Sequence, residues 1–395
     1  MAYRWLQTEL EAKRQAALVR RPRRVQSLES GWCEVDGRKL RNFASNDYLG
    51  LAADERVLAA AACALDEAGA GARASALVCG RSEWHDRLEQ ELAKFEGTEA
   101  VLLFPTGFAA NAGTIPALVG PGDAVLCDRL NHASLVDGCK MSGAKLLVYP
   151  HADVATVQRL LVERTDFRRR MIVTDSLFSM DGDAAPLAEL ANLAEEHNAM
   201  LLVDEAHATG LFGTHGRGLT ETAGINGVRV VKTGTLSKAI GAQGGFVAGT
   251  RTLIDWLYNT ARTQMFSTAL APAACAAALA AIDIIRTEPE RRGRLLAESA
   301  RLCETLRRHG LSVPAGVTGP IIPIVLGSEQ ATLAAARELE ERGDLVAAIR
   351  PPTVPRGTSR LRISLSAAHP SADIDALADA LTELLRDSIS SPGSA

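Results

Sequence analysis

From about residue 85 to residue 249 the sequence alternates between short apolar runs and amphipathic segments, and this alternation constrains the fold more than any other feature. The apolar runs predict buried strands at 100–107, 123–128, 144–150, 170–178, 199–207, 228–233 and 246–249. The segments between them predict helices at 84–97, 108–120, 132–143, 154–164 and 187–198. Apolar strands that alternate with helices form a mostly parallel sheet covered on both faces, so the sequence predicts a large α/β domain.

The rest of the chain predicts a helical N-terminus and a smaller C-terminal domain. Residues 271–310 predict one long helix, and the strands and helices that follow are expected at 321–327, 330–343, 345–350, 360–366 and 371–388. The basic N-terminus predicts an amphipathic helix interrupted by Glu9 and Glu11, which is typical of neither a signal peptide nor a membrane span. We therefore expect an N-terminal helical segment at 1–45, a large α/β domain at 46–270, a linking helix with a small α+β domain at 271–388, and a disordered tail at 389–395.

Charge and cysteine content argue against several classes of protein. The formal net charge of −4 provides no overall attraction to nucleic acid or to a membrane surface. The seven cysteines are scattered, odd in number and never spaced as CxxC, which argues against a disulfide framework or a zinc site. We therefore expect a cytoplasmic protein without a metal site.

Small and polar residues follow several of the predicted strands, and ligands of such sheets bind beyond the carboxyl ends of the strands. Gly107 and Phe108 open a helix, where backbone N–H groups would suit a phosphate, although a plain strand–helix connection is an alternative. His132 stands at the next strand end and helix start, and a capping or surface histidine is the alternative. Ser179 lies in "SLFSMDGD", which is either part of a site or a Ser-rich turn.

The segment "MLLVDEAHATG" places Asp204, Glu205 and His207 at the end of a predicted strand. An acid at such a place is suited to hold a cation or a protonated ring nitrogen. "DEAH" is also typical of nucleotide hydrolases, but that class needs an upstream GxxxxGK[ST] sequence, which this chain lacks. The chain also lacks GxSxG, HExxH, and GxGxxG after a strand, so serine hydrolases, zincins and Rossmann dehydrogenases lack their required motifs.

Lys238 lies in the small-residue turn "GTLSKAIGAQGG" between two predicted strands. A solvated surface lysine is one interpretation of this turn. The other is a lysine held close to a bound group, because a lysine amine reacts well only when its pKa is depressed or its nitrogen forms an imine. Pyridoxal phosphate needs a lysine imine, an anion site, an acid at its pyridine nitrogen and a flat group over its ring. The predicted strand ends supply residues for all four.

Several long segments of the chain match the motifs of one known family, in the family's order. They cover roughly residues 40–370 and read "NFASNDYLGL", "LFPTGFAAN", "DRLNHASLVDG", "FSMDGDAAPL", "VDEAHATGLFGTHGRG", "TGTLSKAIGAQGG" and "FSTALAP". On these segments the chain resembles the α-oxoamine synthase family of fold type I pyridoxal phosphate enzymes. The resemblance implies an aminotransferase-like large domain with a mostly parallel sheet covered by helices, plus the small α+β C-terminal domain and the N-terminal helical segment.

The resemblance also implies roles for individual residues. Lys238 would form the internal aldimine and later act as the base, Asp204 would pair with the pyridine nitrogen, and His207 would contact the ring hydroxyl. His132 would stack on the ring face. Further cofactor contacts would come from Gly107, Phe108, Ser179 and Thr235, with Ser267 or Thr268 reaching the phosphate from a partner subunit.

The family's reaction is a decarboxylative condensation of an amino acid with an acyl thioester, and substrate roles follow from it. Arg20, Thr353 and Arg362 would hold substrate carboxylates and acyl groups, and Asn46 would lie nearby. Side chains alternate along the strand expected at 360–366, so Arg362 should lie on the face opposite Leu361. The apolar face should pack on the helices of the domain, which leaves Arg362 to face the cofactor.

The segment "AIRPPTVPRGTSRLRISLSAAH" resembles most closely the branch that condenses L-alanine with a pimeloyl thioester in the shared sites of a homodimer. The acyl carrier would be coenzyme A or acyl carrier protein. The basic run Arg20–Arg24 suits either carrier, or it is a solvated surface patch. Relatives that use glycine or serine share the front motifs. A non-catalytic regulator on the same fold would need a DNA-binding module ahead of it.

One stretch departs from the family pattern, in which a sequence like GSGGSR is followed by VSG. Here Gly69–Gly80 reads "GAGARASALVCG", and the family's small or polar positions are occupied by Arg73, Ala74 and Cys79. Ser75, Gly80 and His85 keep the register. A Cβ where the family has glycine narrows the conformational freedom of the backbone. The resemblance is therefore weaker for the acyl-donor end of the site than for the cofactor end.

Overall fold

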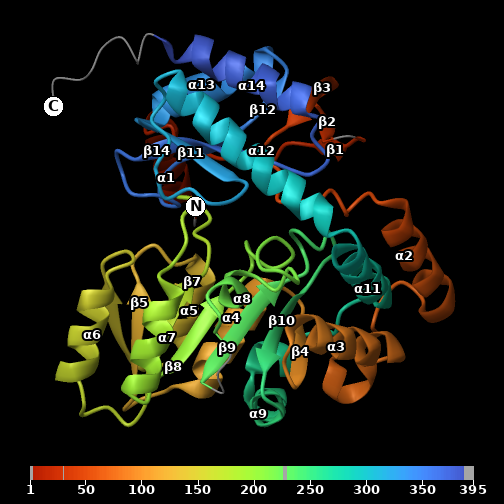
Figure 1. Ribbon diagram of the computed structural model, residues 1–395, viewed down its shortest axis with the longest axis vertical. Helices are drawn as coiled ribbons and strands as arrows, with labels where there is room; N and C mark the ends of the chain where they lie inside the picture. The colour runs from red at the N-terminus through yellow and green to blue at the C-terminus, as the bar shows by residue number, and fades with distance from the viewer. Residues whose placement is uncertain (1–2, 30, 226–228, 387–395) are drawn as a thin grey trace. The chain divides into compact units, whose positions relative to one another are not determined.

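The structure is a computed structural model that describes residues 3–29, 31–225 and 229–386 (Figure 1). The chain divides into two compact units. The larger unit comprises Leu49–Ser179 and Asp183–Gly293, and the smaller unit comprises the described residues of Met1–Tyr48, Met180–Gly182 and Arg294–Ala395.

The larger unit is built on a seven-stranded sheet with the strand order β4-β10-β9-β8-β7-β5-β6. The strands are β4 (Ala100–Phe104), β5 (Ala124–Asp128), β6 (Lys145–Tyr149), β7 (Arg170–Asp175), β8 (Met200–Asp204), β9 (Val230–Thr235) and β10 (Gly245–Gly249). β10 runs antiparallel to β4 and β9, and the other neighbouring pairs are parallel. The predicted mostly parallel sheet is therefore confirmed, and the carboxyl ends of β4, β5, β7, β8 and β9 share one edge.

The helices predicted between these strands are present. They are α3 (Glu83–Glu96), α4 (Gly107–Leu118), α5 (Ala133–Met141), α6 (Val154–Glu163) and α7 (Leu187–Glu196). The unit also contains α2 (Glu55–Ala68), the short π-helical turn η1 (Ala76–Gly80), α8 (Leu219–Thr222), α9 (Arg251–Thr260), α10 (Arg262–Met265) and α11 (Pro272–Thr287). α4 packs on α5 and on β9 and β10, while α7 packs on α6 and on β7 and β8.

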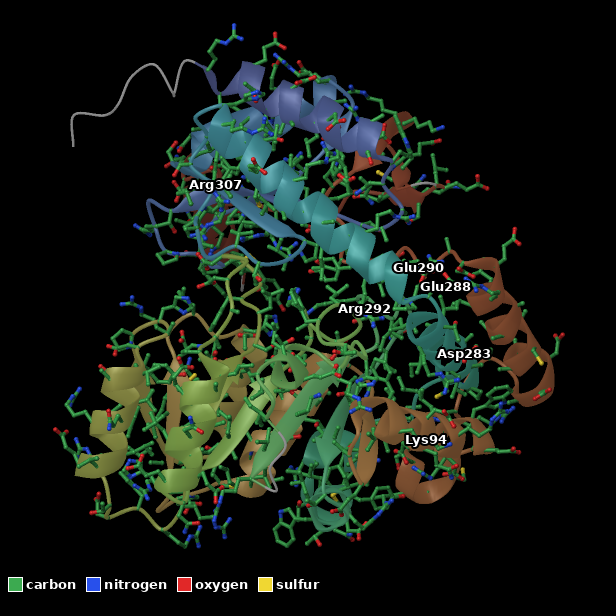
Figure 2. The ribbon with its side chains drawn as sticks, viewed as in Figure 1. Lys94, Asp283, Glu288, Glu290, Arg292 and Arg307 are labelled. Carbon is green, nitrogen blue, oxygen red and sulfur yellow. The ribbon has the colours of Figure 1, made fainter. Side chains whose placement is uncertain are left out.

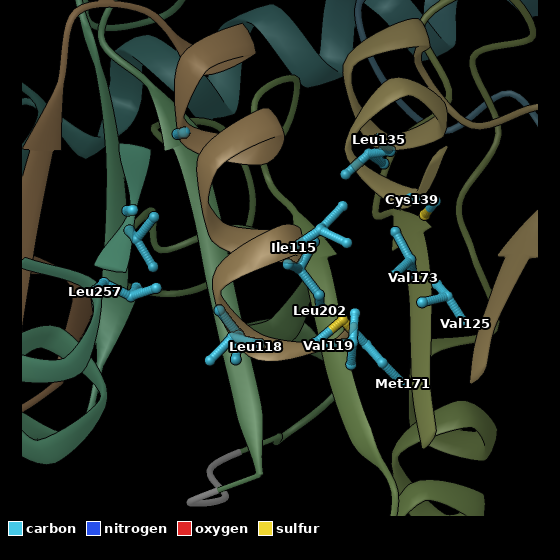
Figure 3. Close-up of a cluster of buried hydrophobic side chains, with 14 of the residues drawn as sticks. Ile115, Leu118, Val119, Val125, Leu135, Cys139, Met171, Val173, Leu202 and Leu257 are labelled. Atoms are coloured by element: carbon cyan, nitrogen blue, oxygen red, sulfur yellow. The ribbon is translucent and has the colours of Figure 1, made fainter. Parts of the chain in front are cut away.

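An apolar cluster between the sheet and helices α4, α5 and α9 holds the larger unit together (Figure 3). Its fully buried members include Ile115, Leu135, Val173, Leu202 and Leu257. Burying one side chain of this kind contributes roughly 1.5–3 kcal/mol relative to leaving it exposed. The cluster therefore fixes the strands against the helices, and with them the residues that follow the strand ends.

The smaller unit contains two sheets. The three-stranded antiparallel sheet has the order β11-β14-β13, with β11 (Ile321–Gly327), β13 (Ala347–Ile349) and β14 (Ser359–Ser364). The four-stranded sheet has the order β1-β2-β3-β12, with β1 (Val25–Ser27), β2 (Trp32–Val35), β3 (Arg38–Asn42) and β12 (Asp344–Leu345). The helices α1 (Arg4–Gln15), α13 (Glu329–Glu341) and α14 (Ser371–Leu384) agree with the predicted ones.

The first 48 residues differ from the separate segment expected at 1–45. Their strands were not predicted, and β3 pairs in parallel with β12, with Arg41 opposite Asp344. The Arg41 guanidinium also lies 2.6 Å from the carboxylate of Asp344, whose side chain is fully buried. Backbone pairing and this ion pair therefore join the N-terminal residues to the C-terminal domain in one unit.

The single helix predicted at 271–310 is two helices. α11 ends at Thr287, and α12 (Pro289–Arg308) begins at Pro289, because a proline lacks the N–H that would continue the hydrogen-bond ladder. Arg292 donates to the carbonyl oxygen of Ile285 at 3.0 Å and so satisfies one acceptor near the end of α11 (Figure 2). Because α11 packs on α2 and α3, the larger unit extends to Gly293 instead of residue 270.

The predicted tail at 389–395 lies outside the described residues. Within the described ranges, none of the helices combines the length and apolar character that crossing a membrane requires.

Candidate active site

The carboxyl-end edge of the sheet in the larger unit gathers most of the predicted cofactor residues. Asp175 and Asp204 end the neighbouring strands β7 and β8 and are paired in register, so their side chains leave the same face. Gly107 directly follows the turn after β4, and Lys238 follows β9. The predicted convergence of these residues is therefore present within one unit.

Asp204 is a buried carboxylate with defined hydrogen-bond donors. It is 5% exposed, its Oδ2 accepts from Asn111 Nδ2 at 2.6 Å, and its Oδ1 accepts from the backbone N–H of Ala206 at 2.8 Å. Asn111 also donates to Ser134 Oγ at 2.9 Å. Both oxygens of Asp204 thus accept hydrogen bonds, which hold the carboxylate at the end of β8, where it could pair with a protonated ring nitrogen.

His132 stands between two roles that the sequence left open. It caps α5, since its Nδ1 accepts from the backbone N–H of Ser134 at 3.3 Å and lies 2.7 Å from Ser134 Oγ. Its own backbone N–H donates to Asp175 Oδ2 at 2.7 Å. The side chain is nevertheless exposed, so the capping role leaves ring surface open at the strand ends.

The electrostatics of these groups tie them together. Desolvation lowers the pKa of His132, the charge of Asp204 opposes this, and the charge of Lys238 adds to it, so the imidazole is favoured in its neutral form. Burial and then the charge of Asp204 raise the pKa of Asp175 well above its usual range. The site thus contains a neutral ring next to an acid and an amine.

Lys238 and His207 are in direct contact. Lys238 Nζ lies 2.9 Å from His207 Nε2, with His207 6% exposed and Lys238 partly buried. Glu205, between Asp204 and His207 in the chain, instead accepts from Ser176 Oγ at 2.7 Å and from the backbone N–H of Thr220 at 2.7 Å. Glu205 is therefore a buried structural acid, separate from the lysine and the histidine.

A cradle for an anion lies at the start of α4. A Cβ on Gly107 would stand 3.1 Å from Thr235 Cβ and 3.3 Å from its Oγ1, so the glycine lets the helix start approach the turn after β9. Thr235 Oγ1 lies 2.7 Å from Ser237 Oγ and donates to the carbonyl of Gly244 at 2.9 Å. Phe108 is 48% exposed beside this turn. Backbone N–H groups at a helix start, flanked by hydroxyls, are suited to phosphate.

Ser179 lies in the turn that follows β7. The turn is closed by an antiparallel bridge between Leu177 and Ala184 and by a hydrogen bond from Phe178 N–H to the carbonyl of Asp183 at 2.9 Å. Ser179 is partly buried there.

The stretch that departs from the family pattern is tied to the predicted phosphate-contacting residues. Ser75 forms an antiparallel bridge with Thr268, and Ala269 N–H donates to the carbonyl of Ala74 at 3.0 Å. Arg73 has a φ of 68°, a left-handed conformation that favours glycine, which accounts for the small residue usual in the family. The changed stretch is therefore held next to Ser267 and Thr268 by backbone hydrogen bonds.

The smaller unit brings the predicted substrate residues into two groups. Arg362, 4% exposed on β14, donates to Asn46 Oδ1 from both terminal nitrogens at 3.2 Å and to Ser364 Oγ at 2.7 Å. Arg20 donates to the carbonyl of Arg350 at 3.3 Å, which also accepts from the N–H of Thr353 at 3.2 Å. Asn46 and Arg362 thus form one group, and Arg20 and Thr353 form the other.

The residues of the larger unit fit pyridoxal phosphate. This cofactor requires an amine, an acid, a flat ring with exposed surface and an anion site such as a helix start opened by glycine. Lys238, Asp204, His132 and Gly107 supply them.

Sequence reasoning missed three residues of this edge: Asn111, Ser134 and Asp175. Asn111 was detectable as a polar residue inside the apolar helical segment "FAANAGTIPAL". Asp175 ends an apolar run in "MIVTD" just as Asp204 ends "MLLVD", so the same pattern could have found it. Ser134 carries no comparable signal.

Comparison with known proteins gives a consistent result. The family described as aminotransferase class I and II matches residues 38–381. The chain is 53% identical over 383 residues to the 8-amino-7-oxononanoate synthase of Anaeromyxobacter dehalogenans (strain 2CP-1), covering 97% of this chain and 96% of that protein. A solved serine palmitoyltransferase from S. paucimobilis with a bound PLP–myriocin aldimine has a TM-score of 0.92 and 30% identity over 98% of both chains. The 8-amino-7-oxononanoate synthase structure from Francisella tularensis has a TM-score of 0.77 and 26% identity, covering 88% of this chain and 98% of that one.

Proposed function

We propose that this chain, which belongs to the aminotransferase class I and II family and within it to the 8-amino-7-oxononanoate synthases, condenses L-alanine with a pimeloyl thioester in biotin biosynthesis. The products are 8-amino-7-oxononanoate, carbon dioxide and the free thiol, and the enzyme depends on pyridoxal phosphate. The observation that carries the proposal to this chain's own residues is the contact of Lys238 with His207, at the edge that also holds Asp204.

The residues of the larger unit divide the chemistry among them. Pyridoxal phosphate, when bound, supplies a ring that withdraws electrons from the α-carbon of the substrate. Lys238 would hold the cofactor through Nζ, and its amine would serve as the base that takes the α-proton of the substrate. Asp204 would keep a proton on the pyridine nitrogen, His207 would contact the ring hydroxyl, and His132 would lie on the ring face.

The phosphate and the carboxylate of the substrate are bound by separate groups of residues. The N–H groups of Gly107 and Phe108 and the hydroxyls of Ser179 and Thr235 hold the cofactor. Arg362 binds the carboxylate of alanine, because its guanidinium fork matches two carboxylate oxygens and Asn46 orients it from the side. Arg20 and Thr353 contact the acyl donor.

The active enzyme is a homodimer with shared sites, in which Ser267 or Thr268 reaches the phosphate of the partner. Exposed apolar side chains support this assembly: Leu77, Val78 and Phe266 are 43%, 78% and 70% exposed. They lie on adjacent segments, because η1 packs on α10 and Ser75 bridges Thr268. A second copy of the chain covers this surface and brings Ser267 and Thr268 to the other site.

The carrier of the pimeloyl group is coenzyme A or acyl carrier protein, and both present phosphate to the basic run Arg20–Arg24. The reaction takes place in the cytoplasm, a compartment that suits a chain in which none of the seven cysteines forms a disulfide.

The choice of amino acid is tested by spectral titration. Purified protein with pyridoxal phosphate is titrated with L-alanine, glycine and L-serine, and product formation with pimeloyl-coenzyme A is followed for each. We expect alanine alone to give both a spectral change and 8-amino-7-oxononanoate. Turnover with glycine or serine at the alanine rate would place the chain in another branch of the family. Serine is included because the backbone of the solved serine palmitoyltransferase is closely similar to that of this chain.

A further inference from the structure

His151 is a partly buried histidine that none of the proposed catalytic steps uses. It follows β6, and 20% of its side chain is exposed. Its Nδ1 lies 3.1 Å from Asp128 Oδ1, and its Nε2 lies 2.7 Å from Asp183 Oδ2. The ring of Phe178 meets it edge to face, with the ring centroids 4.4 Å apart. The imidazole is thus held in one orientation between two carboxylates.

The geometry fixes the charge of this ring. Each nitrogen faces a carboxylate oxygen, and an ionised carboxylate only accepts hydrogen bonds, so both nitrogens carry protons. Burial opposes the charge, but the hydrogen bonds to Asp128 and Asp183 outweigh it and raise the pKa of His151 to about 10. His151 is therefore a constant cation at physiological pH.

Asp128 connects the cation to the loop that carries His132. It is 1% exposed at the end of β5, its Oδ1 accepts from Leu130 N–H at 2.8 Å, and its Oδ2 accepts from Ala152 N–H at 2.8 Å. The backbone N–H of Asn131 adds a hydrogen bond to the Asp128 carbonyl at 3.2 Å. Asp128 therefore fixes the conformation of the short loop that leads from β5 to His132.

Asp183 connects the cation to the turn that carries Ser179. Its carbonyl accepts from Phe178 N–H at 2.9 Å, and the bridge between Leu177 and Ala184 closes the same turn. The carboxylate of Asp183 and the ring of Phe178 both reach His151 from this turn.

We propose that His151 is a positioning residue whose imidazolium clamps the 128–132 loop to the 177–184 turn and so fixes His132 relative to Ser179. The proposal rests on the proposed function, because it assumes that His132 and Ser179 both contact the cofactor. It predicts that loss of the cation loosens both segments together and weakens cofactor binding.

The test compares His151→Gln and Asp183→Asn with a matched control, His215→Gln. His215 also pairs with a carboxylate, Glu221, at 2.5 Å, but its side chain is 63% exposed and it lies away from the carboxyl-end edge. Pyridoxal phosphate affinity is measured by absorbance titration, together with kcat, KM and the melting temperature of the apoprotein.

We expect His151→Gln and Asp183→Asn each to weaken pyridoxal phosphate binding at least tenfold, with His215→Gln unchanged. In the double variant His151→Gln/Asp183→Asn, the loss of cofactor affinity should be smaller than the sum of the two single losses, because both substitutions break the same clamp. With saturating cofactor, kcat should fall while KM for alanine stays within about twofold of the wild type. Cofactor affinity of His151→Gln equal to that of His215→Gln, or strictly additive losses, would overturn the proposal.

A second readout works on the apoprotein and needs no activity. Amide hydrogen exchange in 128–132 and 177–184 should speed up in both segments of His151→Gln and in neither segment of His215→Gln. If the wild type fails to bind the cofactor, the proposed function is wrong, and this exchange still decides whether the clamp exists. Unchanged exchange in either segment would refute the clamp while leaving the proposed function intact.

Discussion

Replacing Asn111 with alanine removes a hydrogen bond to the buried carboxylate of Asp204. Asn111 Nδ2 lies 2.6 Å from Asp204 Oδ2, and the two residues are 2% and 5% exposed. A hydrogen bond to a charged group contributes roughly 1.5–3 kcal/mol. The N–H of Ala206 still donates to Oδ1, so the carboxylate stays in place but loses the donor to Oδ2. At about 1.4 kcal/mol per factor of ten, we expect cofactor affinity to fall roughly 10- to 150-fold.

The assay is an absorbance titration of the apoprotein with pyridoxal phosphate. Thr114→Val is the matched control: Thr114 lies on the same helix, is fully buried, and its hydroxyl makes no hydrogen bond within the part of the chain that the structure describes. The control should bind the cofactor as the wild type does. Equal affinities for Asn111→Ala and Thr114→Val, with both apoproteins folded, would refute the role of Asn111 in supporting Asp204.

Three further predictions concern the substrate, the assembly and the pH range of stability. Arg362→Ala should keep the cofactor spectrum but raise the alanine midpoint about 30-fold to a few thousand-fold, since truncating one partner of a buried charge pair costs roughly 2–5 kcal/mol; an unchanged midpoint in the alanine titration would exclude Arg362 from the carboxylate site. Phe266→Asp should give monomers of low activity in sedimentation experiments, because it places a charge in the proposed dimer surface, and a fully active dimer would contradict that surface. Burial lowers the pKa of His369 from 6.5 to about 4, so the stability that its neutral form contributes is complete above pH 6.5 and is lost as the pH falls to about 4. The loss is about 3 kcal/mol, and His369→Gln should lack it in urea unfolding across this range, whereas identical pH profiles for both proteins would contradict the buried neutral ring.

The sequence predicts the larger unit well because its strands are buried on both faces. Such strands read as apolar runs, as in "LLVD" before Glu205, and each run ends where a polar residue reaches the open edge. The parallel order then brings Asp204, His207 and Lys238 together, although they are separated along the chain. The apolar pattern of the strands and their parallel order therefore both place these residues at the same edge of the sheet.

The features that the sequence did not predict depend on contacts between distant segments. β1 and β3 are short and largely polar, and β3 is fixed by its pairing with β12 about 300 residues later. No local periodicity marks such a strand. The break between α11 and α12 was visible as Pro289 in the sequence, but the continuous apolar spacing on both sides favoured one helix.

The altered Gly69–Gly80 stretch combines a glycine that close packing requires with an arginine in a left-handed conformation. A Cβ on Gly80 would stand 2.0 Å from the carbonyl oxygen of Ala74, so the glycine that this chain retains is required by a close approach. Arg73 takes a left-handed conformation that costs a non-glycine residue roughly 1–2 kcal/mol.

The most direct test of the account is to identify the residue that holds pyridoxal phosphate. The wild-type protein with bound cofactor is reduced with borohydride and digested, and the modified peptide is identified by mass spectrometry. Lys232 provides an internal control, since it lies on the adjacent strand β9 and is buried against Glu96. The account predicts a reduced cofactor label on Lys238 and none on Lys232. A label on any other lysine, or no label in a protein that forms 8-amino-7-oxononanoate, would contradict it.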